Sequence, residues 1–317
     1  MILLEKMWRN SRMKITKRVE PKAKIKVVSG SNFSVETAEH LPRLHQLCCL
    51  FSRKGTFKTT AITNLLKMYQ DTGTMDRCIW ISSTASSNKK LIEHLHIKPE
   101  DLLDPDDPEC INKLIQIVED ERDEFLRFQH LVKHYDKAMN DMKIGLPISD
   151  EYLVAYYDVS TDQFRKPVPK YKCWLKGRPA IISATFDDVL GHAVLSNRAT
   201  MRLAQKHRHI GAFDSGGAVG ISLYFLVQSF KAVGGINRSI RNNASTFMIG
   251  RTKDAEELKE IASSCAGVVE PEVFYKVYDE ATKDSPHDFL FCDLHPKKGQ
   301  PLFRKNFDTY LFLDGVN

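Results

Sequence analysis

Residues 46–60 read QLCCLFSRKGTFKTT and contain the residue types that bind a triphosphate. A loop between a strand and a helix directs several backbone N–H groups and the positive end of the helix dipole at one point, which suits phosphate. In this pattern Lys58 is expected to reach the terminal phosphates and Thr59 to hold Mg²⁺. The predicted binding loop consists of Ser52, Arg53, Lys54, Gly55, Thr56, Phe57, Lys58, Thr59 and Thr60.

The loop departs from the ideal spacing of Gly, four residues, Gly, Lys, and Ser or Thr. Ser52 and Phe57 replace the two outer glycines, so Gly55 is the only glycine left. Glycine is favoured in such loops because it accepts positive φ and lets the backbone approach a ligand. Phe57 therefore predicts either local strain or an altered cradle. The motif by itself fits a working nucleotide site and a chance match equally well.

A second group that could do chemistry is the acid pair that ends the apolar run PAIISATFDD, residues 179–188. Mg²⁺ prefers one or two carboxylates together with phosphate oxygens, so we assign Asp187 to the metal, directly or through water. Asp188 is then the candidate that polarises an attacking water. The alternative is that both aspartates cap the following helix.

A third candidate is the amide that ends the hydrophobic run GISLYFLVQ, residues 220–228. Beside a phosphate loop, Gln228 could hydrogen-bond both the γ-phosphate and the attacking water, and so report which nucleotide is bound. The alternative is an amide at a loop edge that is satisfied by its own surroundings.

These groups need a particular scaffold. Residues 59–69 carry apolar residues at helical spacing, and residues 77–83 read as a short buried strand. Together with the runs 179–188 and 220–228, they predict an α/β fold with a mainly parallel central sheet flanked by helices. In such a sheet, ligands bind at the carboxyl ends of the strands, so Lys58, the acid pair and Gln228 should converge there.

The remaining segments predict additions to this core. Residues 99–124 hold eleven acids and two bases, and residues 111–139 look helical and amphipathic, so we expect a helical insertion at about 99–165. This insertion could be a lid, a subunit contact or a merely decorative pair of helices. Further on, we expect helices at 254–263 and 270–282 and strands at 289–294 and 309–313, which would finish the sheet at its edge.

The 317-residue chain is expected to hold one decorated domain, residues 31–317, after a basic arm at 1–30. Residues 1–26 contain nine Lys and Arg against two Glu, within a formal net charge of +6. Such an arm could bind DNA phosphates or an acidic protein surface, or be a solvated terminus. A second basic segment, residues 202–209, could contact a DNA backbone or the carbonyls of its own helix end.

We expect neither secretion nor a membrane span, because the apolar run MILLEKMW is too short for a signal peptide and no 18-residue apolar stretch occurs. Seven cysteines without a C-x-x-C pair predict a reduced, intracellular setting. The histidine and cysteine groupings form no four-ligand set, so we interpret them as surface or packing residues.

Three stretches carry a resemblance to a known family: FDDVLGH (186–192), RLAQKHRHIG (202–211) and SLYFLVQSFKAVGGINRSIRNNAS (222–245). Over residues 40–250, the chain resembles the genome-packaging ATPases of the FtsK–HerA superfamily, found in poxviruses, other large double-stranded DNA viruses and virophages. The resemblance implies a RecA/ASCE-like P-loop NTPase fold with ATP and Mg²⁺. It carries the phosphate lysine onto Lys58, the hydroxyl ligand onto Thr59, the metal acid onto Asp187, the catalytic acid onto Asp188 and the sensor amide onto Gln228.

The resemblance also implies a motor that pumps double-stranded DNA into a preformed capsid as a ring of identical subunits, a pentamer or a hexamer. Its partners would be DNA and capsid proteins, and it would work in the host cytoplasm or viral factory and associate with the virion. Each site would be completed by an arginine from the neighbouring subunit. Arg241 lies in the matching stretch Ile-Arg-Asn-Asn and is our choice; an arginine that bridges a surface carboxylate is the alternative. The other candidates are Arg202, Arg208 and Arg238.

Two other functional classes fit parts of the sequence. Ser52 and Phe57 suit a catalytically inactive scaffold that binds DNA or capsid. A small-molecule kinase would share the phosphate loop, but an adjacent acid pair and a Gln-tipped strand suit water activation rather than transfer to a hydroxyl.

Overall fold

The computed structural model describes residues 35–53, 55–84, 88–230, 235–252, 254–265 and 269–313. The chain divides into residues 1–32 and residues 33–317. The predicted basic arm at 1–30 and Lys54 of the predicted loop lie outside the described residues.

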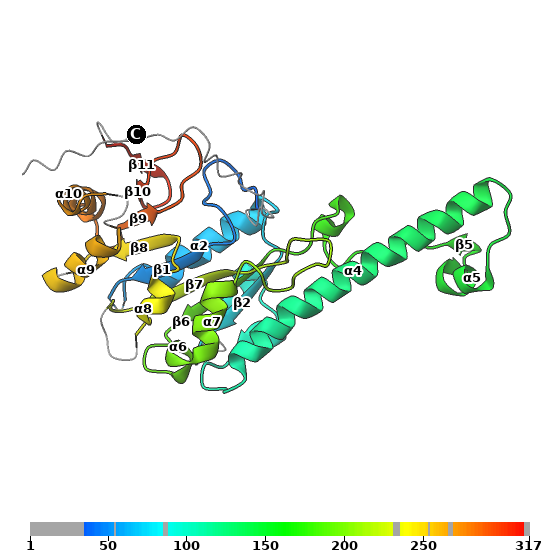
Figure 1. Ribbon diagram of the computed structural model, residues 1–317, viewed down its shortest axis with the longest axis horizontal. Coiled ribbons are helices and arrows are strands. Elements are labelled where there is room, and N and C mark those ends of the chain that lie inside the picture. The colour runs from blue at the N-terminus through cyan, green and yellow to red at the C-terminus, as the bar shows by residue number, and fades with distance from the viewer. Residues whose placement is uncertain are drawn as a thin grey trace, which may run out of the picture. The chain divides into compact units, whose positions relative to one another are not determined.

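The centre of the second unit is a nine-stranded sheet (Figure 1). Six neighbouring strands, from β8 to β3, run parallel, and β9, β10 and β11 extend one edge in antiparallel pairs. The prediction of an α/β fold with a mainly parallel sheet is confirmed, and the order places β7 between β1 and β6, as in a RecA-like fold. In spatial order the strands are β11 (Thr309–Leu311), β10 (Phe303–Lys305), β9 (Phe289–Asp293), β8 (Thr246–Gly250), β1 (Leu47–Phe51), β7 (Ser222–Val227), β6 (Ile182–Asp187), β2 (Arg77–Ile81) and β3 (Leu102–Leu103).

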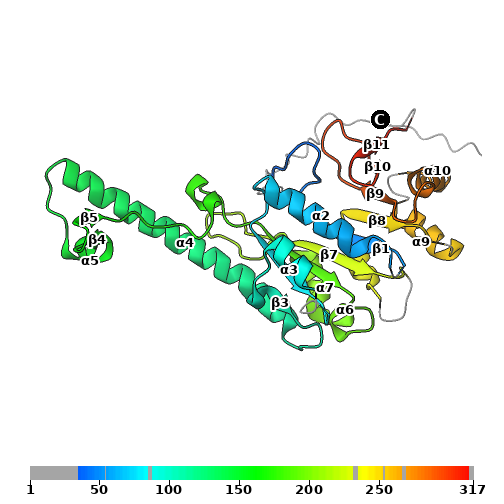
Figure 2. The same cartoon turned by 180° about the vertical axis from the view of Figure 1, so that it is seen from behind.

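Helices cover both faces of the sheet because successive strand residues point to opposite sides. Cys48 and Leu50 of β1 share one apolar cluster with α2 (Lys58–Asp71) and α3 (Lys89–Leu95), which Figure 2 shows on the near face. Leu47, Cys49 and Phe51 share the other cluster with helices of the opposite face. These are the start of α4 (Cys110–Lys143), α6 (Ala193–Ser196), α7 (Arg198–Lys206), α8 (Arg238–Arg241), α9 (Ala255–Cys265) and α10 (Pro271–Thr282).

The segment that we predict as a helical insertion contains the 34-residue helix α4, which includes the helix expected at 111–139. Both views show α4 running out beyond the sheet, with α5 (Asp150–Tyr156) and the pair β4 (Tyr157–Asp158) and β5 (Gln163–Phe164) at its far end (Figures 1 and 2). The short helices η2 (Pro99–Asp101) and η3 (Lys172–Lys176) precede and follow α4 in the chain, and Trp174 of η3 packs on Phe125 of α4.

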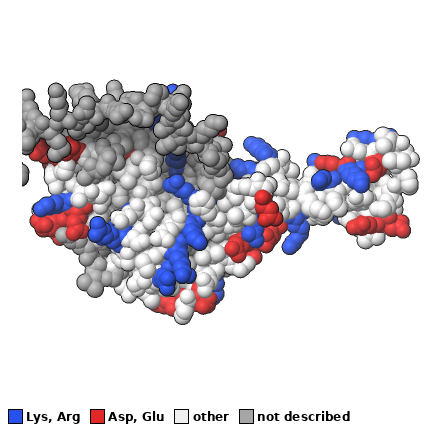
Figure 3. Space-filling view, viewed as in Figure 1, with Lys and Arg blue, Asp and Glu red and all other residues white. Residues whose placement is uncertain are grey.

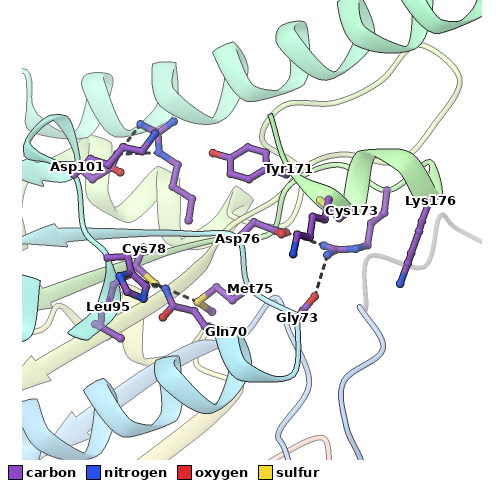
Figure 4. Close-up of a pocket in the computed structure, with 15 residues that line it drawn as sticks. Gln70, Gly73, Met75, Asp76, Cys78, Leu95, Asp101, Tyr171, Cys173 and Lys176 are labelled. Carbon is purple, nitrogen blue, oxygen red and sulfur yellow. Dashed lines mark hydrogen bonds and ion pairs between the residues drawn. The ribbon is translucent and has the colours of Figure 1, made fainter. Parts of the chain in front are cut away.

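A buried ion pair between Glu121 of α4 and Arg77 of β2 connects the helix to the sheet. The carboxylate of Glu121 accepts hydrogen bonds from Arg77 (2.6 Å), Lys170 (2.7 Å) and Tyr171 (2.9 Å), and Arg77 also pairs with Asp101. Arg77 and Asp101 border a cavity of about 520 Å³ near the start of β2 (Figure 4). Because α2 runs from the phosphate loop toward this end of β2, the cavity lies at the opposite edge of the sheet from the loop.

The structure also bears on three simpler expectations. The strands expected at 289–294 and 309–313 are confirmed as β9 and β11 at the sheet edge. All seven cysteines are free and buried. Within the described ranges, no helix is both long and apolar enough to cross a membrane.

Candidate nucleotide-binding site

The three segments that carry the predicted site residues end at the same edge of the sheet. Phe51 of β1 lies beside Val227 of β7, and Leu226 lies beside Asp187 of β6. The residues that follow these strands, Ser52, Gln228 and Asp188, therefore leave the sheet side by side. This is the convergence that the sequence predicts, because β1, β7 and β6 are parallel and in register.

The loop after β1 closes on the amino end of α2. Gly55 adopts a positive φ of 74°, and the Lys58 ammonium donates to the carbonyl oxygens of Ser52 (2.9 Å) and Arg53 (2.8 Å). The Thr56 hydroxyl donates to Ser52 Oγ (2.8 Å). The first turn of α2 contains no acidic residue, so no carboxylate competes for the positive end of the helix dipole. A lysine and a free helix end thus face one small loop, which suits a phosphate group.

Phe57 does not adopt the positive φ that glycine accepts in such loops, so the strain expected from a positive φ is absent. Its φ is −93° and its ψ is −8°. The ring points away from the loop into the core, where it stacks on Phe289 with ring centroids 4.5 Å apart. Gly250, at the end of β8, provides the space beside it. The structure therefore supports the other expectation for Phe57, an altered phosphate-binding loop, in which the ring is turned toward the core.

We predict that Gly250→Ala displaces residues of the phosphate loop, because Gly250 packs against the core side of that loop. A Cβ at this position would lie 2.3 Å from Ser52 Oγ and 2.6 Å from Phe57 Cε1, so both residues would have to move. Overpacking of this kind costs about 1–3 kcal/mol of unfolding free energy. Thermal unfolding and calorimetric titration with ATPγS should show lower stability and weaker binding. Ser52→Gly removes two of the three close contacts, so the double variant should recover both properties; no recovery would contradict this explanation.

Thr59 and Asp187 form a pair of oxygen donors at the centre of the edge. The Thr59 hydroxyl donates to Asp187 Oδ2 (2.9 Å). Burial raises the pKa of Asp187 above its usual value, and the nearby charge of Asp188 raises it further, while Thr59 and Lys58 act in the opposite direction. Burial likewise lowers the pKa of Lys58, and the charges of Asp187 and Asp188 oppose that shift. The four side chains therefore share one electrostatic environment.

The donor set of this pair fits Mg²⁺. A hydroxyl and a carboxylate are hard oxygen ligands, and Mg²⁺ completes its shell with waters and substrate phosphates rather than with an all-protein cage. Throughout the described part of the chain, no group of three or more His, Cys, Asp or Glu residues could hold a metal by itself. Thr59 and Asp187 would thus hold Mg²⁺ together with the phosphates of a bound nucleotide.

The raised pKa of Asp187 predicts how pH acts on the nucleotide-free protein. The folded state binds the proton of the Asp187 carboxyl more tightly than the unfolded state does. The resulting contribution to the free energy of unfolding is fully present below the unfolded pKa and is lost as pH rises through the folded pKa. Asp187→Asn keeps an acceptor for Thr59 and removes the buried charge. Urea unfolding at several pH values should show that this variant is at least as stable as wild type at neutral pH and that its advantage shrinks as pH falls through the folded pKa of Asp187. A variant that is less stable at neutral pH would contradict the prediction.

Asp188 has an unusual backbone. It is exposed and adopts a left-handed φ of 56°, which Asp and Asn tolerate better than most residues. The next helix, α6, has His192 as its N-cap, without a side-chain capping bond. The alternative that the acid pair caps the following helix is therefore wrong.

Gln228 follows β7 directly and is half-buried. Among the described residues its amide has no hydrogen-bond partner, so the alternative of an amide satisfied by its surroundings finds no support there. Gln228 lies beside the loop after β1, because the backbone N–H of Ser52 donates to the carbonyl oxygen of Val227 (3.2 Å).

Arg241 is engaged within its own chain. Its guanidinium donates to the carbonyl oxygen of Phe230 (2.8 Å), lies 4.0 Å from the centre of the Phe230 ring, and is 4.0 Å from a carboxylate oxygen of Glu260. The contact with Glu260 is the carboxylate bridge that the alternative expects, and the role as a trans-acting arginine stays a prediction. Of the other candidates, Arg202 and Arg238 are exposed and Arg208 is half-buried.

The basic segment at 202–209 contains both buried and exposed side chains. His207 is buried and its pKa is lowered to about 4 by that burial, so it is a packing residue. Arg198, Arg202 and Lys206 are exposed at four-residue spacing and line one face of α7. Figure 3 shows a band of Lys and Arg crossing this face of the molecule, where α7 lies in Figure 1. We refer to these three residues as the α7 basic stripe.

Sequence reasoning missed two residues that support the site. The role of Gly250 could be recognised only once β8 was known to lie beside β1, where Gly250 contacts Ser52 and Phe57. Glu257 is 8% exposed and contacts the segment after Gln228. Its position four residues before the buried Ile261 on α9 was a signal that this acid, unlike its neighbours, faces the core.

The chain matches no protein-family model and no curated protein sequence. Solved structures that compare with this chain include the genome packaging NTPase B204 from Sulfolobus turreted icosahedral virus 2 in complex with ATPγS, with 12% identity and a TM-score of 0.43 over 84% of this chain and 98% of that one. The DNA-packaging ATPase B204 from Sulfolobus turreted icosahedral virus compares at 12% identity and a TM-score of 0.42, over 82% and 96% of the two chains. The pCW3 conjugation coupling protein TcpA compares at 15% identity and 0.37, over 83% and 61%. Two of these three compared structures are of packaging ATPases, and the third is of a conjugation coupling protein.

Proposed function

We propose that this chain is a Mg²⁺-dependent ATPase that moves double-stranded DNA. The observation that carries the proposal is the meeting of Lys58, the Thr59–Asp187 pair, Asp188 and Gln228 at the carboxyl edge of β1, β7 and β6. Each of these groups has a separate task in the hydrolysis of a phosphoanhydride, and all of them come from neighbouring strand ends.

The residues would divide the chemistry as follows. The loop N–H groups and Lys58 would bind the β- and γ-phosphates, with Lys58 exchanging its loop carbonyls for phosphate oxygens. Thr59 and Asp187 would hold Mg²⁺, which neutralises charge on the phosphate oxygens when bound. Asp188 would orient the attacking water and polarise its O–H bond. Gln228 would hydrogen-bond the γ-phosphate and that water. The products are ADP and inorganic phosphate.

Movement of DNA is supported by the α7 basic stripe. Arg198, Arg202 and Lys206 point to solvent from a helix that packs on the same sheet as the site. Arg and Lys contacts to phosphates give affinity without reading sequence, which a translocating protein requires. The packaging of viral DNA into a capsid, and a ring of identical subunits as the working form, rest on the resemblance of residues 186–192, 202–211 and 222–245 to packaging ATPases.

The proposal is tested by ATP hydrolysis with and without linear double-stranded DNA. Wild type should hydrolyse ATP in the presence of Mg²⁺, and DNA should raise the rate. Lys58→Ala and Asp188→Asn should hydrolyse ATP at least about 100-fold more slowly than wild type in both conditions. Equal rates for all three proteins would remove the catalytic assignment, and DNA binding without any nucleotide binding would favour an inactive scaffold.

The stripe predicts a separable defect in DNA stimulation. Arg198→Gln with Lys206→Gln removes two phosphate contacts and leaves the nucleotide edge intact. We expect basal ATP hydrolysis near wild type, weaker DNA binding, and a slope of log affinity against log salt that is smaller by about 2. Fluorescence anisotropy with labelled duplex over a salt series measures this change. An unchanged slope would show that the stripe does not contact DNA.

A further inference from the structure

Phe230, two residues beyond Gln228, is held by two charged side chains. Its backbone N–H donates to Glu257 Oε1, which also accepts from the hydroxyl of Ser229 (2.7 Å). Its carbonyl oxygen accepts from Arg241 (2.8 Å), and the guanidinium of Arg241 lies over its ring, 4.0 Å from the centre. The N–H, the C=O and the ring of Phe230 are therefore all fixed. We call Glu257 and Arg241 the Phe230 clamp.

The clamped residue also contacts the phosphate-loop strand. Phe230 is 3% exposed, and its ring packs edge-on against Phe51, with centroids 4.7 Å apart. Phe51 is the last residue of β1, immediately before Ser52. The second carboxylate oxygen of Glu257 accepts from the hydroxyl of Thr252 (3.1 Å), just beyond β8. Glu257 thus connects the segments that follow β7 and β8, and Phe230 connects both to the last residue of β1.

The sheet alone does not fix the position of Gln228. Strand pairing of β7 ends at Val227, and the Gln228 amide has no partner of its own among the described residues. The path of Gln228 is therefore set by Val227 before it and by Ser229 and Phe230 after it. A buried carboxylate is unfavourable unless its oxygens are hydrogen-bonded, and Glu257 meets this condition through the groups that it holds in place.

We propose that Glu257 and Arg241 are positioning residues that hold Gln228 at the phosphate edge. This inference rests on the proposed ATPase function and assigns Arg241 a task within its own subunit. It adds Glu257 to the residues on which hydrolysis depends, through its hydrogen bonds to Ser229 and Phe230.

The first test compares Glu257→Ala and Glu257→Gln with Glu256→Ala, a change at the exposed neighbour on α9. Because small misplacement of a group at a reacting centre can cost up to about 100-fold, we expect kcat for ATP to fall about 10- to 100-fold in Glu257→Ala. ATPγS affinity should stay near wild type. Glu257→Gln should recover part of the rate, since its amide oxygen can still accept from Phe230 N–H while its NH₂ cannot accept from Thr252. A kcat equal to that of Glu256→Ala, or a loss of ATPγS binding in parallel with kcat, would overturn the inference.

The second test does not depend on catalysis. Hydrogen–deuterium exchange of the nucleotide-free protein reports the Phe230 amide directly. We expect it to exchange at least about tenfold faster in Glu257→Ala than in Glu256→Ala, with the β7 amides unchanged. Unchanged exchange would overturn the clamp even in an active enzyme. Faster exchange in a protein whose wild type hydrolyses no ATP would instead overturn the proposed function, and with it the catalytic role of the clamp.

Discussion

Asp188→Asn should bind ATP but hydrolyse it about 10²–10⁴-fold more slowly than wild type, the usual contribution of a general base. Asn keeps the size and the hydrogen-bonding shape of Asp but cannot accept a proton from water. It also tolerates the left-handed φ of 56° at this position, so the fold should be unaffected. Single-turnover hydrolysis and calorimetric titration with ATPγS separate the two properties.

The matched control for this change is Asp162→Asn. Asp162 also has a left-handed backbone, with φ of 53°, but follows β4 at the far end of the insertion, away from the nucleotide edge. Normal hydrolysis is expected there. If Asp188→Asn retains the wild-type rate, the catalytic acid lies elsewhere and the assignment of the acid pair is contradicted.

Lys58→Ala should lose both binding and hydrolysis, which distinguishes it from Asp188→Asn. Lys58 donates to two loop carbonyls and is placed to carry the charge of the terminal phosphates. Removal of one such preorganised donor costs about 10²–10³-fold in rate, and the loop also loses the two hydrogen bonds that close it. Hydrolysis assays and ATPγS titrations at equal protein concentration measure both effects.

Lys67→Ala is the control on the same helix. Lys67 forms a surface ion pair with Asp71, one helical turn further along α2, and such pairs contribute little to stability. Its hydrolysis and ATPγS affinity should match wild type. Unimpaired ATPγS binding by Lys58→Ala would contradict the proposed phosphate role of the loop.

Local pattern was enough to predict the segments that form the site. The runs before Ser52, Asp188 and Gln228 are apolar, and each ends abruptly in a polar residue. Because parallel strands share one carboxyl edge, the convergence of these residues followed from the fold class without any knowledge of strand order.

Non-local pairing explains what was missed. β8 is only five residues long and follows the polar stretch RNNAS, so its sequence alone could not be told from a buried loop, although it pairs directly with β1. The two-residue strand β3 and the three-residue strand β10 are defined only by their neighbours. The inward turn of Phe57 depends on space at Gly250, which is remote in sequence. A trans-acting arginine depends on a second subunit, which no single sequence describes.

An experimental structure of the protein with Mg²⁺ and ATPγS tests the nucleotide site most directly. The terminal phosphates should lie on the loop of residues 52–60 within hydrogen-bond distance of Lys58, with Mg²⁺ coordinated at Thr59 and Asp187. Asp188 and Gln228 should face the γ-phosphate. A nucleotide bound elsewhere, or a loop that stays closed on Lys58 at saturating ATPγS, would contradict the assignment of this site.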